Sequence, residues 1–107
     1  MNAIELFVRH QAELDALEYY NYFSARNPEA ALRFLQGVDQ TVRGLQLQPF
    51  KGRRRNFAGV ALKDVRSWRV DGFENYLIFY RLKANRLEIM RIRHGVMLFP
   101  RVLRRKS

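Results

Sequence analysis

The sequence contains no cysteine, and only three prolines and one tryptophan occur in its 107 residues. Without cysteine there is no disulfide framework, no thiolate nucleophile and no cysteine-ligated metal. No stretch approaches the roughly 20 apolar residues that a membrane span requires. The first ten residues, MNAIELFVRH, lack the basic region and the long apolar run of a secretion signal. We therefore expect a cytoplasmic protein with no membrane association, no metal and no cofactor.

Acidic residues are scarce in the second half of the chain. Residues 1–50 carry four basic and six acidic residues, whereas residues 51–107 carry sixteen basic residues and only four acidic ones. Such an excess of like charge lowers the stability of a small domain, and the net charge of +10 exceeds what solubility requires. The imbalance favours nucleic acid or an acidic protein as the partner. The alternative is a solvated basic face that only keeps the protein in solution.

The length predicts a single domain over residues 1–107. A short strand is expected at residues 3–8 and a helix at 10–26. Asn27 and Pro28 then favour a helix stop followed by a new N-cap and first turn. Apolar residues recur every three or four positions from Ala31 to Leu45, which predicts a second helix ending near residue 47. So short a break requires the two helices to pack as an antiparallel hairpin.

The character of the chain changes after Pro49. A basic loop at residues 50–56 precedes three strand-like runs at 62–70, 76–82 and 87–94, and the run 76–80 is apolar on both faces, as expected of a central strand. These elements predict an α+β fold of order β-α-α-β-β-β. In it, a two-helix antiparallel hairpin packs on one face of a twisted antiparallel sheet. Residues 101–107 are expected to form a frayed basic tail.

Several short patterns in this order and spacing resemble the RelE/ParE superfamily of bacterial type II toxin–antitoxin toxins. The first helix carries a pattern similar to A-x-x-D-L-x-x-I-x-x-Y-I, followed by the helix junction and by two late strands. The matching positions are Ala12, Asp15, Ala16, Tyr19, Tyr22, Phe23, Asn27, Pro28, Ala30, Ala31, Phe34, Leu45, Pro49, Gly52, residues 76–81 and residues 89–95. The resemblance covers roughly residues 3–100.

The resemblance implies the fold described above and a cognate acidic antitoxin that wraps the toxin and folds as it binds. It also implies one of two activities. ParE-like members poison DNA gyrase, whereas RelE-like members cut mRNA on the ribosome. A third possibility is an inactive member that only binds its antitoxin.

RelE-like nucleases carry cations on the sheet, an arginine in the third strand, and a tyrosine or a histidine–tyrosine pair near the C-terminus. Here Leu77 stands at the third-strand position, and no tyrosine follows Tyr80. If the chain is a nuclease, Arg66 and His94 are the candidate catalytic residues, because a neutral histidine can accept a proton. His94 has a structural alternative, since a His-Gly sequence also ends the last strand of ParE-like chains. The sequence therefore favours a binding protein that makes no bonds itself.

Arginines on the strands are the candidate binding residues for gyrase and DNA, or for the ribosome and mRNA. The alternation of strand side chains predicts Arg91 and Arg93 on one face together with Leu87 and Ile89, and His94 on the other face with Met90 and Ile92. Trp68 is expected in the core or at the antitoxin, with stacking on a base as the alternative. The predicted target-binding residues are Arg66, Arg69, Arg81, Arg91, Arg93 and Arg101, and the predicted antitoxin-binding residues are Trp68, Arg53, Arg54 and Arg55.

Overall fold

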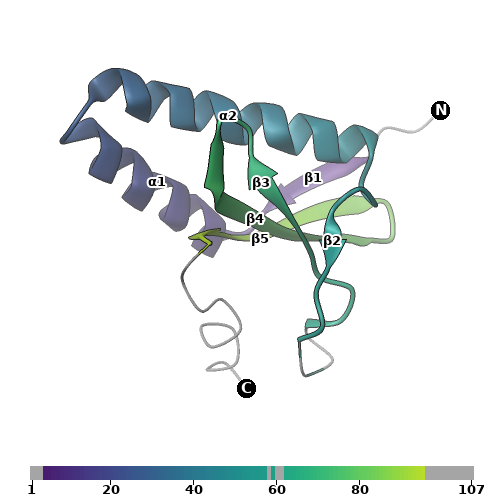
Figure 1. Cartoon of the computed structure of the whole chain (residues 1–107). Coiled ribbons are helices and arrows are strands. Elements are labelled where there is room, and N and C mark those ends of the chain that lie inside the picture. Colours follow the sequence, from purple (N-terminus) through teal and green to yellow (C-terminus); the bar gives the residue numbers. More distant parts are fainter. Residues whose placement is uncertain (1–3, 58, 60–61, 96–107) are drawn as a thin grey trace.

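The computed structural model describes residues 4–57, 59 and 62–95. The predicted tail at residues 101–107 lies outside this part of the chain. The elements follow the order β1 (Glu5–Val8), α1 (His10–Ser24), α2 (Pro28–Leu47), β2 (Arg53–Arg54), β3 (Arg66–Val70), β4 (Phe73–Lys83) and β5 (Arg86–His94) (Figure 1). Both helices lie on the same side of the sheet, which confirms the predicted α+β architecture.

The junction between the helices forms as the sequence predicts. The Asn27 side chain accepts hydrogen bonds from the backbone amides of Glu29 and Ala30, at 3.1 and 3.3 Å, and Pro28 occupies the first helical position. These bonds satisfy two of the amides that a helix N-terminus leaves free. The two helices therefore fold back on each other with almost no connecting loop.

The sheet has five strands in the order β1-β5-β4-β3-β2, so β4 is central, as predicted. It differs from a purely antiparallel sheet at β1, which pairs with β5 in parallel. The predicted basic loop also contains a strand, because Arg53 and Arg54 pair with the start of β3. The sheet is therefore mixed, with β1 and β2 at its two edges.

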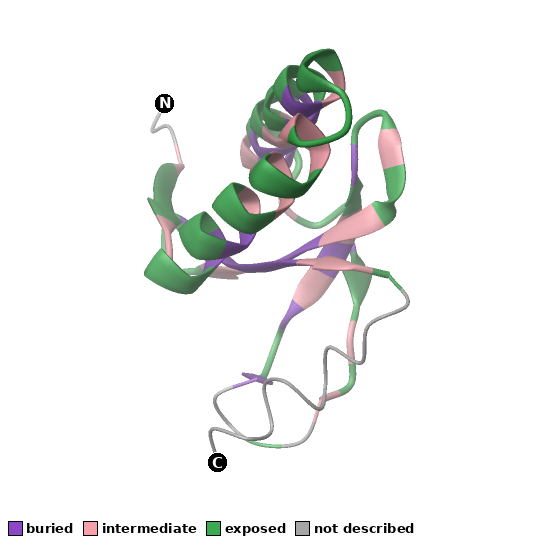
Figure 2. Cartoon of the chain, turned by 90° about the vertical axis from the view of Figure 1, so that its left-hand side faces the viewer, coloured by how far each residue is buried: buried purple, intermediate pink, exposed green. Residues whose placement is uncertain are grey.

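The core lies between the helix hairpin and the sheet. Phe34 and Leu45 of α2 pack with Ile78 and Tyr80 of β4, and all four are fully buried. Figure 2 shows buried segments where helices and sheet meet and further ones on the other side of the sheet, with the outer surfaces of both helices exposed. One face of the sheet is therefore covered by helices. We call the other the open face.

A bulge in β5 changes which way its arginines point. Ile89 pairs with Tyr80 and Arg91 pairs with Phe79, so Met90 is an extra residue without a partner opposite. The predicted grouping of Arg91 and Arg93 with Leu87 and Ile89 is therefore wrong. Leu87, Ile89 and Ile92 all face the helices, whereas Met90 packs on the open face.

Candidate functional site

The centre of the open face is apolar. Phe79 and Leu77 point to this face because they alternate with residues that face the helices. Leu62 and Val65, from the segment before β3, pack on Phe79 and Met90, and Val65 is fully buried. The sequence reasoning missed this second cluster, although apolar residues between two strongly basic stretches were a visible signal. Leu77, which stands where RelE-like nucleases carry an arginine, is therefore part of a small hydrophobic core.

Arg91 and Arg93 are held by an acidic residue of the first helix. The Asp15 carboxylate accepts hydrogen bonds from Arg91 at 2.8 and 3.1 Å and from Arg93 at 3.3 Å. It also accepts one from the backbone amide of Ile92 at 3.0 Å. Asp15 is 3% exposed and Arg91 is 8% exposed. Both predicted binding arginines are thus ion-paired with one buried carboxylate inside the fold, and an acid on the apolar stripe of α1 was the signal for this cluster.

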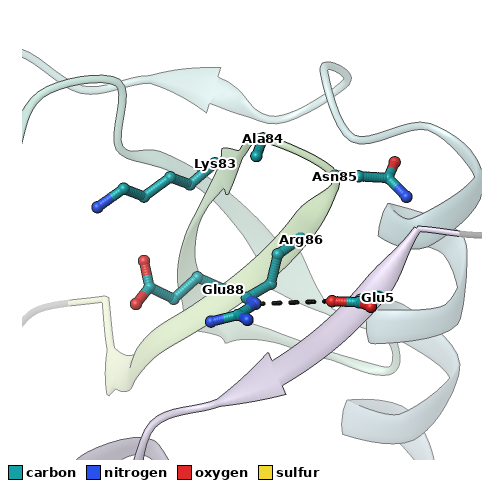
Figure 3. Close-up of a pocket in the computed structure, with 6 residues that line it drawn as sticks. All are labelled: Glu5, Lys83, Ala84, Asn85, Arg86 and Glu88. Atoms are coloured by element: carbon teal, nitrogen blue, oxygen red, sulfur yellow. Dashed lines mark ion pairs between the residues drawn. The ribbon is translucent and has the colours of Figure 1, made fainter.

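Arg81 takes part in a second ion-pair cluster on the open face. Its Nε donates to Glu88 at 2.7 Å, while Arg9 donates to the other carboxylate oxygen at 3.0 Å. Burial alone would raise the pKa of Glu88, but the hydrogen bonds from Arg81 and Arg9 outweigh burial and hold the pKa below its ordinary value. Glu88 also lines a hollow beside the β4–β5 turn, where Glu5 and Arg86 face each other from neighbouring strands (Figure 3).

The three consecutive arginines of the predicted antitoxin surface have different surroundings. Arg54 pairs with Asp64 at 3.3 Å on the surface. Arg55 donates to the Ser67 hydroxyl at 2.8 Å and lies 5.7 Å from the centre of the Phe79 ring. Burial, and then the charge of Arg53, lower the pKa of Arg55. Arg53 is exposed and makes no ion pair with the described residues.

Arg66 fixes the segment between α2 and β2 through hydrogen bonds to its backbone. Its guanidinium donates to the carbonyls of Phe50 and Gly52, at 3.2 and 2.9 Å, and lies 5.2 Å from the Phe50 ring centre. The Tyr80 hydroxyl holds the same segment, because it donates to the Pro49 carbonyl at 2.8 Å and accepts from the Gly52 amide at 3.0 Å. Arg66 therefore has a structural role, and Phe50 is held in place with 65% of its surface exposed.

Trp68 lies at the rim of the main core with two cations on its ring. Lys51 Nζ is 4.9 Å from the ring centre and the Arg69 guanidinium is 4.7 Å from it. Neither cation forms an ion pair within the part of the chain that the structure describes. This group combines an aromatic surface with two charges that an acidic partner would neutralise.

His94 contacts aromatic residues of the helix side. Its ring lies edge-on to Tyr76, with ring centres 4.9 Å apart, and its backbone amide donates to the Tyr19 hydroxyl at 3.1 Å. Arg66 pairs with Tyr80 and His94 pairs with Tyr76, so the two candidate catalytic residues are separated by four residues along β4. Four strand residues span about 13 Å. The structure therefore does not bring Arg66 and His94 together.

Three further predictions concern Arg101, a metal site and a membrane span. Arg101 lies outside the described residues. Within residues 4–57, 59 and 62–95, no group of three or more histidine or carboxylate side chains could hold a metal ion. No described helix is long and apolar enough to cross a membrane.

The family model of the ParE toxin of the type II toxin–antitoxin system parDE matches residues 6–99. The chain therefore belongs to this family, and it is a ParE-type toxin of a type II toxin–antitoxin system. No curated protein matches it.

Solved structures with the same fold include proteins from three bacteria. The chromosomal ParDE toxin–antitoxin system from P. aeruginosa matches with a TM-score of 0.67 and 23% identity, over 86% of this chain and 96% of that one. The YoeB/ParE toxin from Agrobacterium tumefaciens matches with a TM-score of 0.54 and 16% identity, over 84% and 96%. The RelBE2 toxin–antitoxin complex from Mycobacterium tuberculosis matches with a TM-score of 0.50 and 18% identity, over 87% and 99%.

Proposed function

We propose that this toxin acts by binding its target, DNA gyrase, and does not cut RNA. The observation that carries the proposal is the state of the open face. A ribonuclease needs unpaired cations there to stabilise the charge of the transition state. In this chain Leu62 and Val65 cover the centre of that face, and Asp15 holds both Arg91 and Arg93 in ion pairs.

The positions of the proton-transfer candidates support the same proposal. A general acid and a general base must both reach the reacting phosphate within hydrogen-bonding distance. Arg66 donates to backbone carbonyls, and His94 is separated from it by four residues along the sheet. Leu77 supplies no charge between them.

The surfaces left uncovered suit an acidic antitoxin that contributes apolar side chains. The outer sides of the helices expose four leucines by 39–56%: Leu14, Leu17, Leu32 and Leu35. Three cations at the β2 end of the sheet make no ion pair with the described residues: Lys51 before β2, Arg53 of β2 and Arg69 of β3. A disordered acidic segment could cover both surfaces and fold as it binds, which would give tight association with a large negative heat-capacity change.

Two assays on the same purified toxin test the proposal. Gyrase supercoiling should be inhibited, and cleaved DNA complexes should accumulate. Ribosome-bound mRNA should stay intact at the same toxin concentration. The opposite pair of results would establish the alternative, a ribosome-dependent mRNA endonuclease.

His94→Gln sharpens this test. Glutamine keeps hydrogen-bonding capacity but cannot act as a general base near neutral pH. We expect toxicity in cells to fall only in proportion to lost stability. Full loss of toxicity in a variant that still folds and binds the antitoxin would favour the nuclease.

A further inference from the structure

The outer edge of β1 is open for hydrogen bonding. Glu5 and Arg9 donate their backbone amides to Asn85 and Ile89 of the β4–β5 hairpin, at 2.9 and 3.0 Å. Backbone groups alternate between the two sides of a strand, so those of Leu6 and Val8 point away from β5. Among the residues that the structure describes, none bonds to the backbone of Leu6 or Val8.

This edge is short, at four residues, but it lacks two of the usual protections against pairing with another chain. Edge strands are commonly kept from pairing by lysine, by proline or by a covering segment. β1 contains neither residue, and it is the outermost strand of the sheet. Leu6 and Phe7 are exposed by 45% and 43%. An apolar edge of this kind is expected to bind a further strand.

The order of residues in β1 is complementary to itself. Glu5, Leu6, Phe7, Val8 and Arg9 run from an acid to a base around a central phenylalanine. In an antiparallel pair centred on Phe7, Leu6 of one copy lies opposite Val8 of the other, so the free backbone groups of both meet. In the same register, Glu5 of each copy lies opposite Arg9 of the other, and the two Phe7 rings form a cross-strand pair.

The side chains that would meet are accessible in the single chain. Glu5 is 73% exposed on its side chain, and its ion pair with Arg86 is long, at 3.8 Å (Figure 3). Arg9 uses its Nε for Glu88, and its side chain is still 38% exposed. Glu5 and Arg9 therefore need not break their internal contacts to face a second copy.

We propose that the β1 edge binds a second copy of this chain and forms a symmetric dimer with one continuous sheet. The twofold axis passes between the two Phe7 residues and is perpendicular to the sheet. Both open faces then lie on the same side of the dimer. The net charge of +10 opposes this association, so the dimer is expected to be weak and to need physiological ionic strength, at which charges are screened beyond about 8 Å.

Sedimentation equilibrium of the full chain between about 10 µM and 1 mM tests the proposal at this ionic strength. The average mass should rise with concentration from the monomer towards the dimer. Glu5→Arg and Arg9→Glu should each raise the dissociation constant by about tenfold, because each places two like-charged pairs across the strands. Glu18→Arg makes the same charge change as Glu5→Arg, but on the exposed side of α1, and should leave the dissociation constant unchanged.

Mixing the two strand variants gives the decisive result. A Glu5→Arg chain and an Arg9→Glu chain form two opposite-charge pairs with each other, so the equimolar mixture should dimerise as well as the unchanged chain. Thermal unfolding of each variant shows that the monomer is intact. The proposal is overturned if the full chain remains monomeric at about 1 mM or if the mixture fails to restore association. It is also overturned if Glu18→Arg weakens the dimer equally.

Discussion

The Asp15 carboxylate of α1 accepts two hydrogen bonds from the Arg91 guanidinium of β5, at 2.8 and 3.1 Å, across 76 positions of sequence. The pair lies where β5 continues beyond its last contact with β1, so the edge of β5 is covered there by α1. The bond from the Ile92 amide to Asp15 replaces the ladder bond that a neighbouring strand would make. Asp15 therefore joins the helix layer to the edge of the sheet.

Asp15→Asn should be strongly destabilising. Asparagine keeps the shape of the side chain but leaves the buried Arg91 without its counter-charge, a loss that typically costs about 3–5 kcal/mol. Urea unfolding measures the change. Asp39→Asn is the matched control, since Asp39 pairs with Arg43 on the surface of α2 with 61% of its side chain exposed. That change should cost less than about 1 kcal/mol, and equal losses would contradict the role given to Asp15.

The fold was largely predictable because its signals are local. Asn27 and Pro28 sit next to each other in sequence, and the apolar run 76–80 identifies the central strand by itself. The position of Arg91 depends on the bulge at Met90 and on an acid in another element. Neither can be read from the alternation of residues within β5, so the predicted face was wrong.

Gly37 and Gly44 should respond in opposite ways to alanine. Both lie in α2, where alanine in place of glycine usually stabilises a helix by about 1 kcal/mol. At Gly37 an added Cβ would collide with the backbone carbonyl oxygen of Asp71, whereas at Gly44 it would meet only the flexible end of Lys51 at 3.2 Å. We expect Gly44→Ala to raise the free energy of unfolding and Gly37→Ala to lower it by about 1–3 kcal/mol. A gain at both positions would contradict the close approach at Gly37.

Glu88 should make stability depend on pH in acid. A carboxyl whose pKa is lower in the folded chain stabilises the fold above its unfolded pKa, and this contribution is lost as the pH falls through the folded value. The pKa of Glu88 lies below its ordinary value of 4.5 because of Arg81 and Arg9, with burial acting against them. Unfolding free energies measured from pH 7 to pH 3 should therefore fall below about pH 4.5 more steeply in the unchanged protein than in Glu88→Gln. If the unfolding free energies of the unchanged protein and of Glu88→Gln depend on pH in the same way, Glu88 does not have this role.

The cations beside Trp68 should govern how fast and how tightly the antitoxin binds. Lys51 and Arg69 lie against the Trp68 ring and make no ion pair with the described residues, so an acidic segment docked there gains two counter-charges. Lys51→Glu with Arg69→Glu should weaken antitoxin binding by at least about tenfold and reduce its salt dependence, mainly through slower association. Calorimetry and stopped-flow mixing at several salt concentrations measure both effects.

The matched control for this pair is Lys63→Glu with Lys83→Glu, which makes the same change in net charge at two exposed residues outside the helices and the Trp68 group. Long-range attraction by the whole protein would respond equally to both double variants, because it depends on total charge. A contact at Trp68 responds only to the first. Equal weakening by the two double variants would therefore show that net charge governs the association, and that Trp68 with its two cations forms no distinct part of the antitoxin surface.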